Sequence, residues 1–270
     1  MRHALFLPIF GELAEPRVVA DISAVAESNG WDGVFVWDHM AYRAPVVDIA
    51  DPWITMAAIG MATERVCVGP MVTPIPRRRP WKLAREVATL DRLTRGRFIL
   101  GVGIGGDPGR ELSALGEELD PVARGRLLDE GLEVLEALWS GEEVEHHGAA
   151  YVVDKLRFGP PPWQRPRPPI WVAGRWPNRA PLRRAARYEG YFPINLESPD
   201  QLALLVDDLR AARAALGRDG TGDVVVSGPA GADPAPWAAA GATWWLTGFP
   251  PFEVTEAAVR AVASSSPPLR

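Results

Sequence analysis

Residues 66–102 read VCVGPMVTPIPRRRPWKLAREVATLDRLTRGRFILGV. The apolar run 66–72 is rich in valine and predicts a buried strand. Pro80 then begins a helical pattern in which Leu83, Val87 and Leu90 recur on one face. A second apolar run, 98–102, predicts the next strand. A buried strand, an amphipathic helix and another buried strand in this order are typical of a parallel sheet.

The same rhythm extends from this segment in both directions. The predicted strands are 4–10, 33–37, 66–72, 98–102, 169–173, 190–194, 223–227 and 243–247, with helical patterns between them. A doubly wound open sheet is disfavoured, because Pro8–Gly11 after the first strand is not a glycine-rich phosphate loop. The extended pieces near Val144 and 151–153 and the prolines of 160–168 read as one excursion. We therefore expect an α/β fold, a single (β/α)₈ TIM barrel domain over residues 1–270, with a short excursion between strands four and five.

Composition excludes several kinds of partner. With 47% hydrophobic residues and a net charge of −5, the chain can bury a large core and does not favour nucleic acid or an anionic membrane. Cys67 is the single cysteine, which precludes an intrachain disulfide and is expected to be a buried thiol. No apolar run approaches the roughly 20 residues that span a bilayer, and we expect a cytoplasmic protein.

The residues that follow the predicted strands are mostly glycine and apolar, which suits a flat ligand better than hydrolysis. Among the four histidines only His39 stands at a strand end, so we expect no metal site. A glycosidase pair of carboxyl groups is not evident, and neither Lys82 nor Lys155 is placed for a Schiff base.

His39 could titrate near neutrality at the mouth of a barrel, or it could be an ordinary loop histidine; its position alone does not decide. Asp38 is a candidate to fix its tautomer, although neighbours in an extended chain point opposite ways. We expect Arg77, Arg78 and Arg79 to form a solvated face, with a phosphate or ion-pair role as the alternative.

Two glycine-containing segments are candidate ligand contacts. Gly101–Gly106 is a weak dinucleotide signal, but it would serve as a bare-backbone floor for a ring system. The segment 174–180 places backbone amides at a helix start, which suits a phosphate or an ordinary turn equally.

Several of these segments resemble the bacterial luciferase-like oxidoreductases. The resemblance covers roughly residues 1–195 and is most specific in 72–103. It is carried by segments 72–85, 89–93 and 96–103, with Asp38-His39, Leu138-Trp139-Ser140-Gly141, His147-Gly148 with Tyr151, and 169–174.

This resemblance implies a (β/α)₈ barrel that uses reduced FMN with oxygen, or the deazaflavin coenzyme F420 for hydride transfer, on a small organic substrate. It places His39 beside the reactive ring as the candidate catalytic residue. It also implies a non-prolyl cis peptide at Met71–Val72 that supports the ring, and a phosphate site in the loop 174–180. The expected cofactor-binding residues are Asp38, Met71, Val72, Thr73, Gly103, Gly105, Gly174, Arg175, Trp176 and Ala180.

The chain departs from the family in two ways. It is short, so we expect a trimmed insertion before the last strand and an open pocket. Met40-Ala41-Tyr42 stands where the deazaflavin sugar-phosphate dehydrogenases have a tryptophan, so that substrate class is not carried over. A non-catalytic flavin-binding relative, an unrelated hydrolase barrel and a homodimer all stay open.

Overall fold

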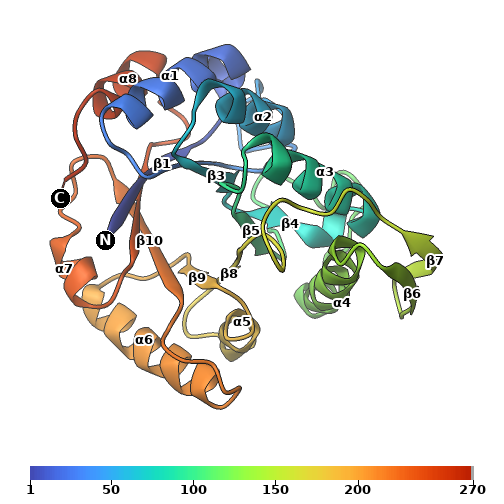
Figure 1. Ribbon diagram of the computed structural model, residues 1–270. Helices are drawn as coiled ribbons and strands as arrows, with labels where there is room; N and C mark the ends of the chain where they lie inside the picture. The colour runs from blue at the N-terminus through green and yellow to red at the C-terminus, as the bar shows by residue number, and fades with distance from the viewer. Residues whose placement is uncertain (269–270) are drawn as a thin grey trace.

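Residues 1–268 of the computed structural model are described, and they form a ring of parallel strands surrounded by helices (Figure 1). The nine strands of the sheet follow the order β3-β2-β1-β11-β10-β9-β8-β5-β4. They are β1 (Arg2–Leu7), β2 (Gly33–Val36), β3 (Cys67–Pro70), β4 (Thr73–Pro74), β5 (Leu100–Gly103), β8 (Ile170–Gly174), β9 (Gly190–Pro193), β10 (Asp223–Pro229) and β11 (Trp244–Gly248).

Backbone hydrogen bonds close the ring between β3 and the residues before β5. The amide of Val68 donates to the carbonyl of Arg97 (3.0 Å), and the amide of Ile99 donates to the carbonyl of Val68 (2.9 Å). β3 lies within the predicted strand 66–72 and β4 directly follows it, with the cis peptide bond between Met71 and Val72 separating the two. Counting them as one gives the eight-stranded barrel that the sequence predicts, and the expected cis bond is confirmed.

The helices follow the strands along the chain, and several of them begin at a side-chain cap. They are α1 (Pro16–Ser28), α2 (Pro52–Ala62), α3 (Pro80–Leu93), α4 (Pro121–Trp139), α5 (Arg179–Ala185), α6 (Pro199–Ala214), α7 (Ala235–Ala239) and α8 (Glu256–Ala263). Asp51, Asp120 and Ser198 each accept a hydrogen bond from a first-turn amide, and a proline follows each of them. These starts use the common pairing of a polar N-cap with proline at the first helical position.

Apolar residues form two separate clusters, one on each side of the sheet. Ala4 and Phe6 of β1 point into the barrel, whereas Leu5 and Leu7 pack outward against the helices. Successive side chains of a strand face opposite sides, so each strand supplies both clusters. The inner cluster consists of Ala4, Phe6, Phe35, Met71, Ile99, Trp171, Phe192, Val225, Trp244 and Leu246.

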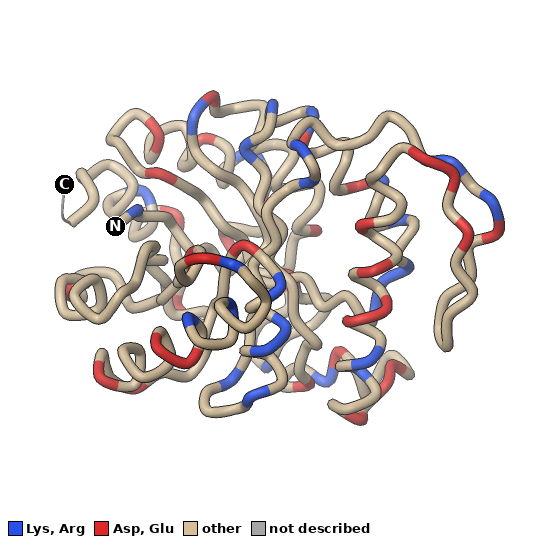
Figure 2. The backbone as a smooth tube through the Cα atoms, turned by 60° about the horizontal axis from the view of Figure 1, so that its bottom comes forward, with Lys and Arg blue, Asp and Glu red and all other residues tan. Residues whose placement is uncertain are grey.

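The expected excursion is the hairpin of β6 (Glu143–His147) and β7 (Val152–Arg157), which projects from the barrel beside α4. Figure 2 shows both Lys or Arg and Asp or Glu on the hairpin and on α4, where the arginines lie in the first turns and the acidic residues follow. Both signs of charge side by side are typical of a solvated face. None of the helices in residues 1–268 has the length and apolar character needed to cross a membrane; the cytoplasmic location stays a prediction.

Several predicted boundaries were wrong. The first strand ends at Leu7 rather than residue 10, because Phe10 instead makes an isolated antiparallel bridge with Ile49. The last helix begins at Glu256 rather than residue 252, because the hydroxyl of Thr255 caps it. Cys67 is only partly buried against the inner cluster, and this burial still raises the pKa of its thiol.

Candidate active site

A buried network of ion pairs lies at the carboxyl ends of β2 and β4. Both oxygens of the Asp38 carboxylate are engaged, Oδ1 by Arg77 and Oδ2 by Arg78, each at 2.7 Å. The hydroxyl of Thr73 also donates to Oδ2. The side chain of Asp38 is fully buried, and Arg77 is 4% exposed. The carboxylate therefore anchors two neighbouring loops and has little capacity left for a ligand.

Glu111 joins this network to His39. Its Oε1 lies 2.9 Å from Nδ1 of His39. Its Oε2 accepts a hydrogen bond from the amide of Met40 (2.9 Å) and lies 2.6 Å from a guanidinium nitrogen of Arg77. Burial raises the pKa of Glu111, but the hydrogen bond and charge of His39, the charge of Arg77 and the Met40 amide outweigh it, and the pKa is lowered. Glu111 is therefore a carboxylate near neutral pH, although its side chain is only 1% exposed.

This arrangement fixes the orientation and tautomer of the imidazole. A carboxylate can only accept a hydrogen bond, so Nδ1 of His39 carries the proton. In the neutral ring Nε2 then keeps a lone pair, and the side chain remains 22% exposed. The negative charges of Asp38 and Glu111 balance the positive charges of Arg77 and Arg78 in the network beside His39. The Glu111 contact therefore fixes the orientation of the His39 ring, with Nδ1 toward the carboxylate.

The loop between β5 and α4 brings Glu111 to this position. Asp107 accepts hydrogen bonds from the amides of Leu112 (2.8 Å) and Ser113 (3.2 Å), which bend the loop back toward the barrel. Gly109 permits close packing, because a Cβ there would lie 2.5 Å from the Cα of Tyr42. The β5–α4 loop therefore rests directly on the loop that carries His39.

Inward-facing residues at the same end of the barrel form an apolar floor. Trp37, Val72 and Ala173 pack on the inner cluster but are only partly buried, and Phe6 retains 9% exposure. Trp37, Val72 and Ala173 lie at or near the carboxyl ends of their strands, whereas Cys67, also partly buried on this cluster, lies at the amino end of β3. Val72 directly follows the cis peptide bond, so this bond shapes part of the floor.

The other expected residues near the floor are less accessible. Met71 is 4% exposed and Thr73 is fully buried. Gly103 is buried, and a Cβ there would lie 2.9 Å from the side chain of Val72. Gly105 is partly exposed and has a positive φ of 74°. Gly103 therefore supports Val72 from behind rather than offering bare backbone to a ring.

On the opposite side of the mouth, main-chain and amide groups replace the charges. Asn195, which follows β9, accepts a hydrogen bond from the amide of Trp176 (2.8 Å) and donates one to its carbonyl (3.0 Å). Within the described residues, no side chain caps the first turn of α5, where Ala180 lies. Gly174 is required for packing, because a Cβ there would collide with Pro181. Arg175 is exposed at the rim.

The structure corrects two expectations and adds one residue. The partner that orients His39 is Glu111 rather than Asp38, because the Asp38 carboxylate is occupied by Arg77 and Arg78. Arg77 and Arg78 are not a solvated face, since they are 4% and 18% exposed; Arg79 is exposed as expected. Sequence reasoning missed Glu111, which lies in an irregular loop. In the sequence, Glu111 is marked only as an acidic residue that directly precedes apolar Leu112.

One group of possible metal ligands occurs in the described part of the chain, away from this site. Glu145, His147 and Asp154 place ligand atoms within 4.8 Å of one another on the exposed β6–β7 hairpin. Solvated carboxylates on a hairpin commonly approach one another without a metal ion, and the barrel mouth does not include them.

Comparison with known proteins identifies the family. The family described as luciferase-like monooxygenase matches residues 1–264, so the chain belongs to that family. This agrees with the barrel, the cis peptide bond and the residues around His39.

Two curated relatives and one solved structure are similar to the chain. A phthiodiolone/phenolphthiodiolone dimycocerosates ketoreductase of Mycobacterium kansasii is 32% identical over 77% of this chain and 60% of its own. An F420-dependent glucose-6-phosphate dehydrogenase of Microbacterium testaceum is 33% identical over 68% of this chain and 54% of its own. The chain thus spans little more than half the length of these relatives. The coenzyme F420-dependent tetrahydromethanopterin reductase of Methanopyrus kandleri has the same fold, with a TM-score of 0.79, 16% identity and 98% of both chains covered.

Proposed function

We propose that this protein is an oxidoreductase that binds F420 at the open end of the barrel and interconverts an alcohol and a ketone. The observation that carries the proposal is the buried Glu111 carboxylate, which holds Nδ1 of His39, while no hydrogen bond to Nε2 is found within residues 1–268. The names of the two curated relatives, a ketoreductase and an F420-dependent dehydrogenase, support the same class of reaction.

The residues at the barrel mouth fit such a coenzyme. The partly exposed floor of Trp37, Val72 and Ala173 is apolar, as the face of a flat ring requires. Arg175 and the uncapped amides at the start of α5, including that of Ala180, would face the phosphate. The amide of Trp176 is already bonded to Asn195, so it is not part of this phosphate site.

When bound, F420 supplies a two-electron hydride acceptor or donor. The chain's own contribution is the accompanying proton. Nε2 of His39 accepts the hydroxyl proton as an alcohol becomes a ketone, and the imidazolium returns it in the opposite direction. Glu111 stabilises the imidazolium through the hydrogen bond at Nδ1. The floor and the loops orient the substrate carbon toward the ring.

The test combines coenzyme binding with variants of His39. Equilibrium titrations of F420 and FMN should show binding of F420, and His39→Ala should leave it nearly unchanged. A positioned base contributes about 10²–10⁴-fold, so we expect His39→Ala to lower turnover by at least about tenfold. His39→Asn should restore activity only if hydrogen bonding alone matters. An early-melting His39→Ala variant with full activity per folded molecule would make His39 a structural residue.

A second candidate is oxygenation with reduced FMN, which the family description as luciferase-like monooxygenase supports. The same floor and His39 would serve it. Tight binding of FMN with no measurable affinity for F420, together with oxygen consumption, would replace the first proposal with this one. Binding of either coenzyme without any turnover would indicate a non-catalytic relative.

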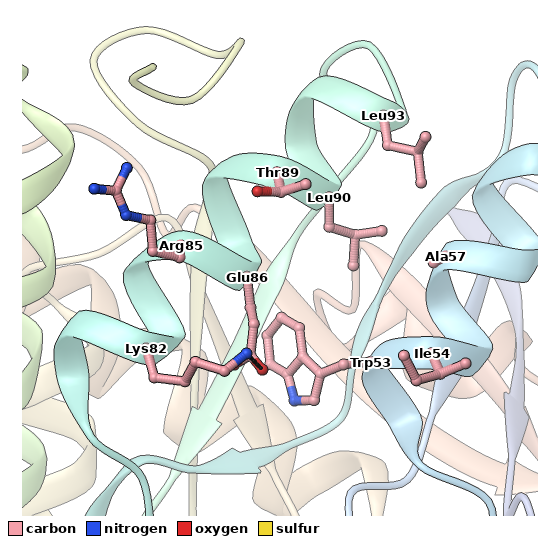
Figure 3. Close-up of a pocket in the computed structure, with 9 residues that line it drawn as sticks. All are labelled: Trp53, Ile54, Ala57, Lys82, Arg85, Glu86, Thr89, Leu90 and Leu93. Carbon is pink, nitrogen blue, oxygen red and sulfur yellow. Dashed lines mark hydrogen bonds and ion pairs between the residues drawn. The ribbon is translucent and has the colours of Figure 1, made fainter. Parts of the chain in front are cut away.

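We also propose that the chain forms a homodimer through a groove between α2 and α3. The groove has a volume of about 310 Å³ and is lined by Trp53, Ile54, Ala57, Lys82, Arg85, Glu86, Thr89, Leu90 and Leu93 (Figure 3). Ile54 and Met61 on α2 are 65% and 72% exposed. A two-fold interface places the same patch on both subunits. Lys82 and Glu86 pair with each other at 2.7 Å within α3, so the exposed apolar side chains of the groove would make the contact between the two subunits.

Light scattering after size exclusion tests the homodimer. Ile54→Glu should dissociate it, while Leu204→Glu, at an equally exposed position on α6 (62%), should not. A monomeric parent protein would refute the proposed interface.

A further inference from the structure

A continuous row of aromatic rings runs outward from the floor past His39. Phe10 lies 5.8 Å from Trp37 and 5.0 Å from Tyr42, measured between ring centroids. Tyr42 lies 5.1 Å from His39 and 5.8 Å from Phe252. The loops that follow β1, β2 and β11 thus contribute one aromatic surface, which we call the aromatic wall: Trp37, Tyr42 and Phe252, with the fully buried ring of Phe10 (1% exposed) packed behind them.

The aromatic wall is partly open to solvent where the mouth meets the surface. Phe252 is 45% exposed, and Met40 and Ile194 at the rim are 59% and 48% exposed. Only residues 230–234 connect β10 to α7, and residues 249–255 connect β11 to α8. Little chain is available on that side to cover these apolar groups. A ligand that covers them gains the free energy of removing apolar surface from water.

The cationic groups in contact with His39's network or with the wall are engaged, whereas exposed Arg110 lies in the adjacent β5–α4 loop. Arg77 and Arg78 pair with Asp38, and Arg77 also pairs with Glu111. The Arg43 guanidinium packs over the rings of Tyr42 and Phe252 at 5.6 and 5.8 Å. The two lysines of the chain, Lys82 and Lys155, belong to α3 and β7 outside the barrel. This environment suits an uncharged group next to His39 better than a phosphate ester.

We infer that the substrate is a bulky, uncharged, largely apolar secondary alcohol or ketone, whose apolar body lies along the aromatic wall while its oxygen reaches His39. The inference rests on the proposed function for the reaction. The choice of substrate class rests on the wall, the engaged arginines and the short loops. Sugar phosphates, which one of the relatives acts on by name, are thereby disfavoured.

Steady-state kinetics with F420 and the series 2-butanol, 2-hexanol and 2-octanol test the inference. Each methylene buried on the wall should lower KM roughly fourfold, the fold-change that corresponds to about 0.8 kcal/mol. Phe252→Ala should flatten this dependence without changing F420 affinity, whereas Leu204→Ala on α6 should leave it intact. Glucose 6-phosphate should be a much poorer substrate. A KM independent of chain length, or preference for glucose 6-phosphate, would overturn the inference.

Binding to the coenzyme-free protein separates this inference from the proposed reaction. Saturation-transfer NMR with 2-octanone should show contact with the parent protein and weaker contact with Phe252→Ala. If neither F420 nor FMN binds but 2-octanone still contacts the wall, the proposed reaction fails and the ligand class stands. If F420 binds and 2-octanone shows no contact, the reaction stands and the ligand class fails.

Discussion

The two sides of the barrel mouth are built from different kinds of group. The side formed by β2, β4 and the β5–α4 loop carries Asp38, Arg77, Arg78 and Glu111 in one buried network around His39. The side formed by β8 and β9 offers main-chain groups and the Asn195 amide. Buried charged groups can fix the orientation of a side chain that gains and loses a proton. Amide groups can bind a ligand without any change in their own charge. This difference supports the proposed proton transfer on the first side and the proposed coenzyme binding on the second.

The largest effect is expected from removal of the Asp38 carboxylate, which tests whether the charged side of the mouth is a structural anchor. Asp38→Ala leaves the guanidinium groups of Arg77 and Arg78 without their buried partner. Breaking such a pair costs about 3–5 kcal/mol, so urea unfolding should show a loss of that size. Asp207→Ala removes an exposed partner of Arg210 and should cost less than about 1 kcal/mol. Equal losses in the two variants would show that the network is not a structural anchor.

Glu111→Gln tests the assignment of proton transfer to the charged side. The amide keeps an acceptor for Nδ1 of His39 but cannot stabilise the imidazolium by charge. We expect kcat to fall roughly tenfold to a hundredfold, about 1.4–2.8 kcal/mol, with coenzyme affinity preserved and the pH–rate profile displaced. Glu117→Gln in the same loop is the control. A purely structural role would instead lower the melting temperature and leave the pH profile unchanged.

Asn195→Ala tests the opposite side. It removes both hydrogen bonds that hold the main chain of Trp176. Each such bond contributes about 1 kcal/mol, so coenzyme affinity should fall about tenfold, measured by F420 fluorescence titration, with kcat at saturation nearly unchanged. Gly174→Val is a poorer probe, because its side chain would collide with Pro181. A loss of kcat without a loss of affinity in Asn195→Ala would reverse the division of roles.

The smallest effect is expected on the free energy of unfolding when the pH is lowered. The folded-state pKa of Glu111 is lowered, as is that of Glu27, which accepts hydrogen bonds from the amides of Glu64, Arg65 and Val66. A carboxyl group with a lowered folded pKa contributes stability above its unfolded pKa of about 4.3, and this is lost as pH falls through the folded value. Urea unfolding between pH 6 and 3 should therefore show declining stability, with a shallower decline in Glu111→Gln. An identical decline in both proteins would remove Glu111 from this dependence.

The barrel could be predicted from the sequence because its pattern is periodic and local. Leu83, Val87 and Leu90 mark the helical face of α3, and the valines of 66–72 mark the strand beside it. The pattern did not show that this strand ends at Pro70 and that a second short strand begins at Thr73; only the family resemblance implied the cis bond between them. That residues 1–270 form a single domain stays a prediction, supported by the parallel pairing of β1 with β11.

Part of the candidate site could be predicted from the positions of the predicted strands. His39 was found because it directly follows a predicted strand. Glu111 was missed because its partner is 72 residues away in the chain, and irregular loops have no periodicity to relate the two. Arg77 and Arg78 resembled a solvated run for the same reason, since the carboxylates that bury them come from other loops.

The filled amino end of the barrel has a consequence for kinetics. Phe35, Trp171 and Trp244 are completely buried inside the ring, and the two tryptophan rings meet at 5.2 Å. These rings fill the interior at that level, so the proposed coenzyme and substrate would both enter from the carboxyl ends of the strands. A ring bound on the floor as proposed would then arrive first and leave last, since a substrate on the aromatic wall would block its path. Initial-rate and product-inhibition patterns should accordingly be those of a compulsory-order mechanism led by the coenzyme.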